Sequence, residues 1–283
     1  MSHHGHLYLV ATPIGNLSDI TLRAIEILKV VDVIAAEDTR HSQRLLTNYE
    51  INTPMFSLHE HNEDARIEKI LALLSDGKSV AVISDAGTPL ISDPGFRLVR
   101  AVKAAGFSVV PVPGPCALIA ALTASGMPTD RFTFEGFLPA KKSALMTYLS
   151  HLDKETRTMI FYESVHRIQK TLTVFCDVFG GERIATIARE LTKTYETIKQ
   201  ASLSELIAWI SEDAQQQKGE FVIVLQGAHL IENSNEAIVD LERLLNILLK
   251  ELSVKQAVKL ACEITGLRRK LVYDSALRLV ISG

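Results

Sequence analysis

Three short apolar stretches, each followed by a loop rich in Gly, Pro and Asp, constrain the fold of this chain most strongly. Residues 80–83 (VAVI) precede the loop Ser84–Gly95, which reads SDAGTPLISDPG. Residues 7–10 and 108–112 precede similar loops, TPIGN at 12–16 and PGPC at 113–116. Loops at the carboxyl ends of buried strands are where open α/β sheets bind cofactors. We therefore expect the three loops to share one pocket.

The stretches around these loops alternate between strand and helix patterns. Strands are predicted at 7–11, 31–36, 80–83 and 108–112, and helices at 20–29, 96–105 and 117–124. This order is typical of βαβ units with a mostly parallel sheet. The first α/β domain is therefore placed at residues 1–128, ending at Gly126-Met127-Pro128.

A second alternating block follows that break. Its predicted strands are 157–162, 183–188 and 221–225, and its predicted helices are 164–177 and 202–210. Ser202 is expected to cap the second helix, with Glu205 three residues later. The fold class is thus α/β, with a second α/β domain at residues 129–227.

The remainder of the chain reads as helix. Leu241, Leu244, Leu245 and Leu248 share one face, and predicted helices at 253–262 and 269–280 flank a turn, so residues 237–283 outline a helix-turn-helix tail. The cluster Arg268-Arg269-Lys270 is the most basic spot in the sequence. It is either the solvated face of a helical cap or an element that contacts phosphate.

Composition narrows the function classes. A net charge of −3 means that any nucleic-acid contact must come from a local patch. Three widely separated cysteines without a CxxC pair argue against a disulfide framework or a zinc site, and His59 and His61 alone do not make a metal site. Without an apolar stretch of about 18 residues or an export signal, we expect a cytoplasmic protein with no bound metal.

The loop chemistry favours a polar small molecule over a nucleotide. Gly87 and Gly95 allow sharp turns and close approach to a ligand, while Asp85, Thr88 and Asp93 supply hydrogen-bond acceptors. A tight turn capped by Asp remains the alternative. The first loop lacks the spaced glycines of a dinucleotide site, and no GKS/T phosphate loop occurs in the sequence. The ligand should be less anionic than a triphosphate.

Eight segments, in order, carry a family resemblance. They read LYLVATPIGNLSDITLRAIEIL, IAAEDTRHS, SLHEHNE, SDAGTPLISDPG, VPGPCALIAALTASGMPTDRF, EGFLPAKK, IFYESVHRI and ARELTKTYET. Together they resemble the ribosomal RNA small-subunit methyltransferase I family, which is similar in fold to the tetrapyrrole (corrin/porphyrin) methylases. The resemblance runs from about Leu7 to Gly227, and the tail resembles the helix-turn-helix extension of the same family.

The resemblance implies methyl transfer from S-adenosylmethionine to the ribose 2′-hydroxyl of a decoding-centre cytidine in 16S rRNA of the small ribosomal subunit. It also implies a homodimer with the cofactor in the cleft between two α/β domains. The Gly-Asp-Pro cofactor loop of the tetrapyrrole methylases falls on Gly87-Thr88-Pro89, so Thr88 replaces their Asp and Asp85 is a substitute carboxylate. By this resemblance the cofactor-binding residues are Pro13, Ser84, Asp85, Gly87, Thr88, Leu90, Cys116, Ala117, Tyr162 and Leu191.

A ribose hydroxyl is a weak nucleophile, so a carboxylate or a neutral amine should accept its proton. We predict Glu37, Lys193 and Glu190 as catalytic candidates. The alternative for each candidate is an ion pair within its own motif, such as Glu190 with Arg189. The predicted RNA-binding residues are Arg40, Arg44, Lys141, Lys142, Arg268, Arg269 and Lys270.

One departure from the family concerns the segment after Pro139. The family is expected to carry a longer Gly/Arg/Lys-rich loop there, whereas Ala140-Lys141-Lys142-Ser143 runs almost directly into a helix. An RNA clamp at this loop is therefore in doubt. Two other functions stay open: a tetrapyrrole methylase acting on a small molecule, and a non-catalytic nucleic-acid-binding protein.

Overall fold

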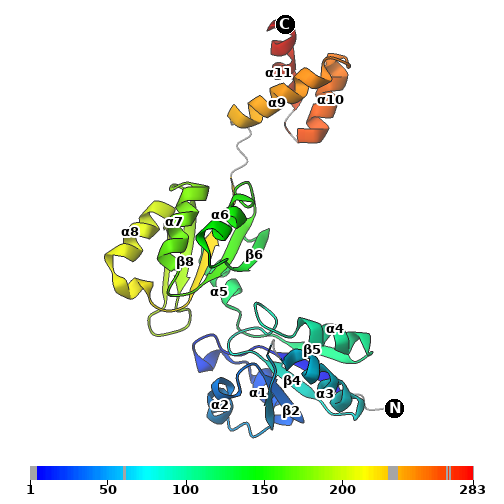
Figure 1. Cartoon of the computed structure of the whole chain (residues 1–283), viewed down its shortest axis with the longest axis vertical. Coiled ribbons are helices and arrows are strands. Elements are labelled where there is room, and N and C mark those ends of the chain that lie inside the picture. The colour runs from blue at the N-terminus through cyan, green and yellow to red at the C-terminus, as the bar shows by residue number, and fades with distance from the viewer. Residues whose placement is uncertain (1–4, 60–61, 229–234, 266, 268, 283) are drawn as a thin grey trace. The chain divides into compact units, whose positions relative to one another are not determined.

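The computed structural model describes residues 5–59, 62–228, 235–265, 267 and 269–282 (Figure 1). The chain divides into two compact units, Met1–Ala228 and His229–Gly283. The first unit holds two five-stranded sheets, and the second is helical. The boundary predicted at residue 128 within the first unit stays a prediction.

The first sheet is parallel throughout, with strand order β3-β2-β4-β1-β5. Its strands are β1 (His6–Val10), β2 (Val33–Ala36), β3 (Met55–Ser57), β4 (Val80–Ile83) and β5 (Ser108–Val112). Its helices are α1 (Leu22–Val30), α2 (Thr39–Asn48), α3 (Glu63–Ser75) and α4 (Phe96–Ala104), with a 3-10 turn at Leu17–Asp19. Helices α1 and α2 pack on one face, and α3 and α4 on the other. Because all five strands run parallel, their carboxyl ends lie at one edge of the sheet, and the loops that follow them gather there.

Side-chain caps fix where these helices begin. The Thr21 hydroxyl accepts from the Ala24 amide at 3.1 Å, so α1 begins at Leu22, two residues later than the periodicity predicts. The Asp38 carboxylate accepts from the Arg40 amide at 2.8 Å and so starts α2 directly after β2. A side chain that satisfies a free amide of the first turn stabilises the helix start.

The second sheet has the order β6-β7-β10-β8-β9, with β6 and β7 parallel and the other pairs antiparallel. Its strands are β6 (Phe132–Phe137), β7 (Thr158–Glu163), β8 (Ile184–Arg189), β9 (Thr197–Ser202) and β10 (Phe221–Leu225). The helices of this half are α5 (Ala117–Ala124), α6 (Lys142–Ser150), α7 (Ile168–Phe179) and α8 (Leu203–Glu212), with a 3-10 turn at Ala214–Gln217. The predicted capping box is confirmed, because Ser202 and Glu205 bond each other's amides.

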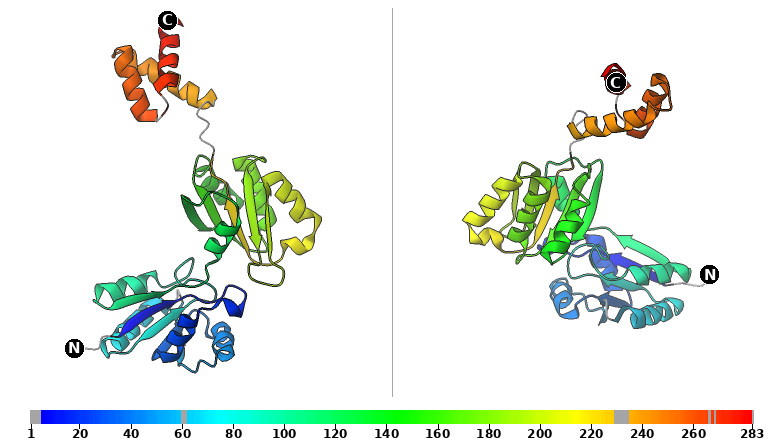
Figure 2. Two further views of the ribbon diagram at one scale, coloured as in Figure 1. Left: turned by 180° about the vertical axis from the view of Figure 1, so that it is seen from behind. Right: turned by 45° about the horizontal axis from the view of Figure 1, so that its top comes forward.

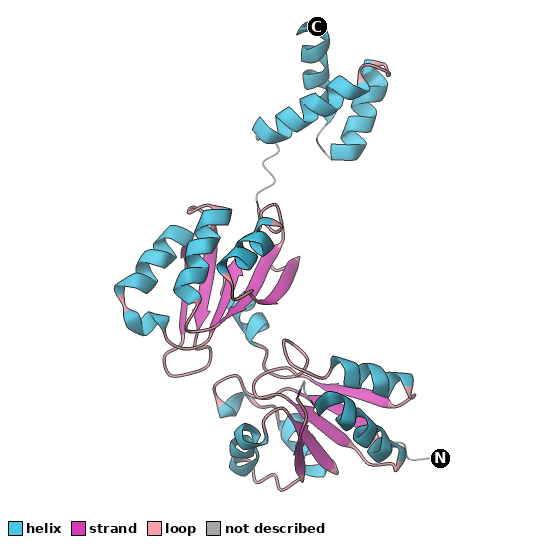
Figure 3. Cartoon of the chain, viewed as in Figure 1, coloured by secondary structure: helices cyan, strands magenta, loops and turns pink. Residues whose placement is uncertain are grey.

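The two faces of the second sheet are covered differently (Figures 2 and 3). Helices α6, α7 and α8 pack against Phe161, Ile187 and Ile223 in a large apolar core. On the opposite face, α5 packs beside Ile160 and Val224, and it is the one helix of the described residues that contributes to this cluster. Part of this second face therefore remains available to line a cavity.

The second unit consists of α9 (Asn235–Leu248), α10 (Val254–Thr265) and α11 (Arg269–Ser282). Leu241 and Leu245 are buried in its core with Val258 and Val272, as the shared leucine face predicts. Within the part of the chain that the structure describes, no helix combines the length and apolarity needed to cross a membrane.

Candidate functional site

A cavity of about 460 Å³ lies where the strand-end loops of the first sheet meet the α5 face of the second. Its volume falls in the usual range for small-molecule sites. The lining residues are Ile14, Glu37, Asp85, Ala86, Gly87, Thr88, Ile91, Ser92, Asp93, Cys116, Ala117, Phe137, Tyr162, Glu163, Ser164, Val165, Ala188, Leu191, Gly219, Glu220, Phe221 and Val222.

Hydrogen bonds join the three loops that the sequence singles out. Thr12 and Gly87 exchange two backbone bonds, with N···O distances of 2.9 and 3.0 Å. The Thr12 hydroxyl also donates to the Ser84 carbonyl at 3.2 Å. The Thr88 hydroxyl donates to the Pro115 carbonyl at 3.0 Å. The loops after β1, β4 and β5 thus form one connected floor, and Thr88 is occupied in holding it.

The loop after β4 stores backbone strain. Gly87 has a φ of 84°, and the non-glycine residues Leu90 and Ser92 have φ values of 72° and 67°. Residues other than glycine rarely adopt this left-handed backbone conformation, and they keep it only where the surrounding structure holds them in it. At Gly87 an added Cβ would lie 3.2 Å from the Ile14 side chain, so glycine also permits close packing of the first loop.

Three carboxylates converge on the cavity from the first sheet. The Asp38 amide donates to Asp85 Oδ1 at 3.0 Å, and the Asp85 amide lies 3.5 Å from Glu37 Oε2. Burial raises the pKa of Glu37, and the negative charge of Asp85 raises it further. Like charges held together in a partly buried site disfavour their shared ionisation.

Asp93 is the most strongly perturbed of these carboxylates. Burial, and then the charge of Glu37, raise its pKa to about 6, although a hydrogen bond from Ser84 opposes the change. Its Oδ2 atom is buried and has no hydrogen-bond partner among the described residues. A desolvated acceptor without a donor is costly unless a ligand supplies one.

The second sheet supplies the opposite, mainly apolar wall. Ala188, Leu191 and Val222 line it with Tyr162, whose hydroxyl accepts from the Leu118 amide at 3.1 Å. Burial raises the pKa of Tyr162 to about 12, so the phenol stays neutral. The hydrogen bond from the Leu118 amide to the Tyr162 hydroxyl fixes the start of α5 against the end of β7.

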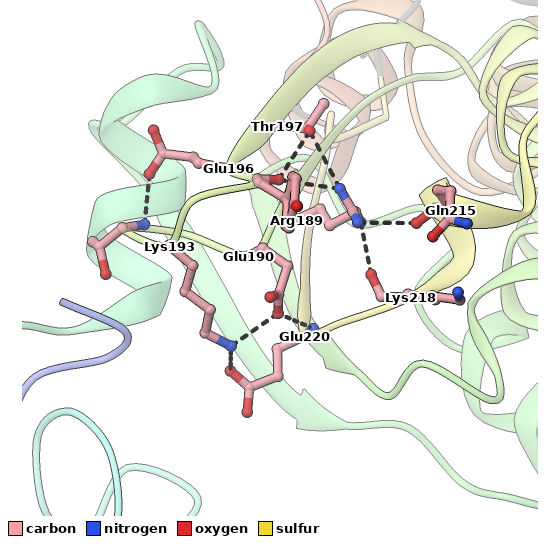
Figure 4. A network of polar contacts seen from close by, with 10 residues as sticks. Arg189, Glu190, Lys193, Glu196, Thr197, Gln215, Lys218 and Glu220 are labelled. Atoms are coloured by element: carbon pink, nitrogen blue, oxygen red, sulfur yellow. Dashed lines mark hydrogen bonds and ion pairs between the residues drawn. The ribbon is translucent and has the colours of Figure 1, made fainter.

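A polar network borders the cavity at the end of β8 (Figure 4). Lys193 Nζ bonds Glu190 Oε1 at 2.8 Å and Glu220 Oε2 at 2.7 Å. Burial lowers the pKa of Lys193, but the bonds to Glu190 and Glu220 outweigh it, and the pKa is raised overall. Lys193 is therefore held as a cation. The pKa of Glu190 is lowered: burial raises it, but bonds from Lys193 and the Glu220 amide prevail.

Arg189 has a different role from the expected ion pair with Glu190. Its guanidinium is buried and donates to the carbonyl oxygens of Lys218, Tyr195 and Gln215, at 2.6, 3.1 and 2.9 Å (Figure 4). Glu190 pairs with Lys193 instead. Glu190 thus makes an ion pair within its own motif, as the alternative expects, but with Lys193 rather than Arg189, because three backbone carbonyls accept from the Arg189 guanidinium.

The structure brings most of the predicted cofactor-binding residues together, with one predicted catalytic residue, Glu37. Glu37, Asp85, Gly87, Thr88, Cys116, Ala117, Tyr162 and Leu191 all line the cavity. Outside the lining set but next to a lining residue in the chain lie Pro13, Ser84, Leu90 and Glu190. Lys193 is also outside the lining set and contacts it through its ion pair with Glu220. The sequence did not identify Phe137, Ala188, Glu220 and Val222 as site residues, although Phe137 and Ala188 lie in the segments EGFLPAKK and ARELTKTYET.

None of the predicted RNA-binding residues that the structure describes is among the residues that line the cavity. Arg40 and Arg44 are exposed on α2, and Lys141 and Lys142 are exposed at the start of α6. Arg269 and Lys270 are exposed on α11 in the helical unit, whereas Arg268 lies outside the described residues. The described part of the chain contains no group of three or more His, Cys, Asp or Glu side chains arranged to hold a metal ion.

Comparison with known proteins gives two family matches. Residues 6–207 match the family described as Tetrapyrrole (Corrin/Porphyrin) Methylases, and residues 235–279 match the RsmI C-terminal HTH domain. A relative from Pseudomonas aeruginosa, named Ribosomal RNA small subunit methyltransferase I, is 52% identical over 97% of both chains. A relative of the same name from Escherichia coli O157:H7 is 50% identical over 96% of this chain and 95% of its own.

Solved structures share the fold at low identity. Diphthine synthase aligns with a TM-score of 0.60 at 12% identity, covering 78% of this chain and 90% of its own. Uroporphyrin-III-C-methyltransferase from Thermus thermophilus aligns with a TM-score of 0.55 at 18% identity, covering 78% and 94%. These likenesses establish the arrangement of strands and helices, as the sequence predicts.

Proposed function

Because the chain belongs to the tetrapyrrole (corrin/porphyrin) methylases and, within them, to the ribosomal RNA small subunit methyltransferase I family, we propose that it methylates small-subunit 16S rRNA with S-adenosylmethionine. The acceptor is the ribose 2′-hydroxyl of a cytidine in the decoding centre. Relatives at about half identity over nearly the whole chain support the rRNA substrate.

The charge of the cavity is the observation that carries the cofactor assignment. Its wall contains no Lys or Arg, and its five carboxyl residues are Glu37, Asp85, Asp93, Glu163 and Glu220. Glu163 and Glu220 are paired with Arg167 and Lys193, so the negative charge of the wall comes from Glu37, Asp85 and Asp93. Such a wall repels phosphate and attracts cations. S-adenosylmethionine, when bound, supplies a methyl group on a positively charged sulfur and also carries an ammonium group. The unpartnered Asp93 oxygen is kept for the acceptor hydroxyl.

The chain's own residues then have two tasks, alignment and proton removal. The connected loops and the α5 face hold donor and acceptor in line, which is the main demand of a displacement. With S-adenosylmethionine bound as methyl donor and leaving as the neutral thioether, the ribose hydroxyl proton would pass to a carboxylate of this chain. Glu37 and Asp93 are the proposed acceptors, because their raised pKa values make them stronger bases than ordinary carboxylates.

Lys193 and Glu190 serve better as a fixed ion pair than as bases. An amine must be neutral to accept a proton, and both bonds of Lys193 favour its charged form. The lowered pKa of Glu190 makes it a weaker base than Glu37. Of the three predicted catalytic residues, Glu37 is the one we retain.

A small-molecule tetrapyrrole methylase is the second candidate, favoured only by the shared fold. Porphyrin and corrin precursors carry several carboxylates, which a wall of acidic side chains would repel. The rRNA substrate avoids this conflict, because only one nucleoside needs to reach the cavity while phosphates contact exposed cations elsewhere. Assembly as a homodimer and a cytoplasmic location remain predictions.

The test is transfer of tritium from labelled S-adenosylmethionine to small ribosomal subunits from a strain that lacks this enzyme. Parallel reactions contain naked rRNA or uroporphyrinogen. We expect label in rRNA at one decoding-centre cytidine after nuclease mapping. Label in uroporphyrinogen and none in rRNA, with cofactor binding intact, would replace the proposal with the second candidate.

A further inference from the structure

An exposed aromatic ring stands in the wall of the cavity. Phe137, the last residue of β6, lines the cavity with 60% of its surface accessible. Burying a phenylalanine is normally favourable, so an exposed ring in a ligand site is a candidate contact surface. None of the tasks assigned above to the carboxylates and loops uses this ring.

A β-bulge brings the ring to this face. The pairing of β6 with β7 shifts between Phe134 and Gly136, so that Phe134 lies opposite Ile160 and Phe137 opposite Tyr162. Ordinary alternation would put Phe134 and Phe137 on opposite faces, but the extra residue returns Phe137 to the face of Phe134. Gly136 has a φ of 66°, which glycine adopts without strain.

The Phe137 ring packs against Tyr162, which supports it. Its centroid lies 5.5 Å from that of Tyr162, edge to face, and Phe134 contacts the same tyrosine at 4.8 Å. Tyr162 is itself fixed by its bond from the Leu118 amide. A supported ring loses little conformational freedom when a planar ligand stacks on it, which favours binding.

The chemistry of the wall indicates which planar ligand fits. Aromatic side chains hold unstacked nucleobases by stacking, and carboxylates accept hydrogen bonds from the exocyclic amine of cytosine. Phe137 shares the cavity wall with Glu37, Asp85 and Asp93. A base that carries an amino group can therefore stack and donate in the same cavity, whereas a phosphate cannot enter favourably.

We propose that Phe137 is the platform on which the base of the acceptor nucleotide stacks, so that its ribose hydroxyl is presented to the cofactor. This inference rests on the proposed function and adds the subsite that selects the base. The apolar wall of Ala188, Leu191 and Val222 remains for the cofactor. Phe137 is thus a binding residue for RNA and leaves cofactor affinity unaffected.

The experiment compares Phe137→Ala, Phe137→Leu and Phe137→Tyr in steady-state methylation of small subunits, with cofactor affinity measured by calorimetry. We expect the Ala and Leu variants to raise KM for subunits by about five- to 150-fold, the range for loss of one stacked base. The Tyr variant should stay within about threefold of wild type. The Kd for S-adenosylmethionine should not change.

Phe132→Leu is the matched control, because Phe132 lies at the other end of β6, is 37% exposed and does not line the cavity. Its KM should equal that of wild type. A Leu variant of Phe137 with wild-type KM would overturn the proposal. So would a parallel loss of cofactor affinity, which would assign the ring to the adenine, or a change in sedimentation, which would assign it to an interface between copies. Inactive wild-type enzyme would instead refute the proposed function.

Discussion

The two sheets contribute opposite kinds of wall to one cavity. The parallel sheet, covered by helices on both faces, contributes loop residues that include the carboxylates of Glu37, Asp85 and Asp93. The mixed sheet contributes mainly apolar and aromatic side chains, such as Tyr162, Ala188 and Val222, from the face on which α5 packs. Under the proposed function, charge recognition and proton transfer belong to the first sheet, and shape and stacking to the second.

The strongest test of this division is the neutral substitution Asp93→Asn. If Asp93 accepts the proton, kcat should fall by about 10²- to 10⁴-fold, the usual contribution of a general base. The measurement is single-turnover methyl transfer at saturating cofactor. Asp64→Asn is the matched control, since its side chain is 77% exposed on α3, away from the cavity. A fall of less than tenfold would remove Asp93 from proton transfer.

A substitution in the strained loop should separate cofactor binding from stability. Gly87→Ala places a side chain at a φ of 84° and within 3.2 Å of Ile14, so the loop must shift. Left-handed strain of roughly 1–2 kcal/mol corresponds to a cofactor Kd about five- to thirtyfold weaker. Calorimetry measures this affinity.

Gly106→Ala is the control for Gly87→Ala. Gly106 has a φ of 82°, and nothing lies within 4 Å of an added Cβ. Both variants should lose similar thermal stability, but only Gly87→Ala should lose cofactor affinity. Equal cofactor Kd values in the two variants would show that the loop does not contact the cofactor.

The pH dependence should follow the first sheet. With its pKa raised to about 6, Asp93 is ionised above that pH and protonated below it. A protonated carboxyl cannot accept the ribose proton, so kcat/KM should fall about tenfold for each unit below pH 6. Rates from pH 5 to 8 measure this limb. Asp93→Asn should abolish it, and survival of the limb in that variant would point to Glu37.

The smallest effect is expected from exposed lysines on the helices that accompany the second sheet. Lys141 and Lys142 are exposed at the start of α6. If each contacts a phosphate, the double change to Ala should lower the slope of log Kd for subunits against log salt by up to about two. Filter binding at several salt concentrations measures the slope. An unchanged slope would place the phosphate contacts elsewhere.

The sequence predicted the first sheet better than the second. Loops rich in Gly, Pro and Asp are recognisable in the sequence where they follow predicted strands. Their positions after three strands of one parallel sheet predicted the shared floor formed by Thr12, Gly87 and Pro115. No such loop identified strand β6, and its bulge depends on how β6 pairs with β7, which the sequence of β6 alone does not show. Phe137 therefore could not be assigned to the cavity. The perturbation of Asp93 likewise depends on burial and on Glu37, which only the folded chain brings near.

The segments 39–48, 55–57 and 63–75 escaped prediction for a related reason. Helix α2 begins at the Asp38 cap immediately after β2, without an intervening loop signal. Strand β3 is only three residues long. The ion pairs were also harder to predict than the elements, because Lys193 reaches both Glu190 and the distant Glu220.

The central claim is that the cavity delivers a methyl group to a ribose 2′-hydroxyl. Alkaline hydrolysis of rRNA labelled by the enzyme tests it most directly, because alkali cleaves the chain only where the 2′-hydroxyl is free. We predict that the label is recovered in an alkali-stable dinucleotide that begins with cytidine. Label recovered in a mononucleotide would place the methyl group on a base and contradict the account.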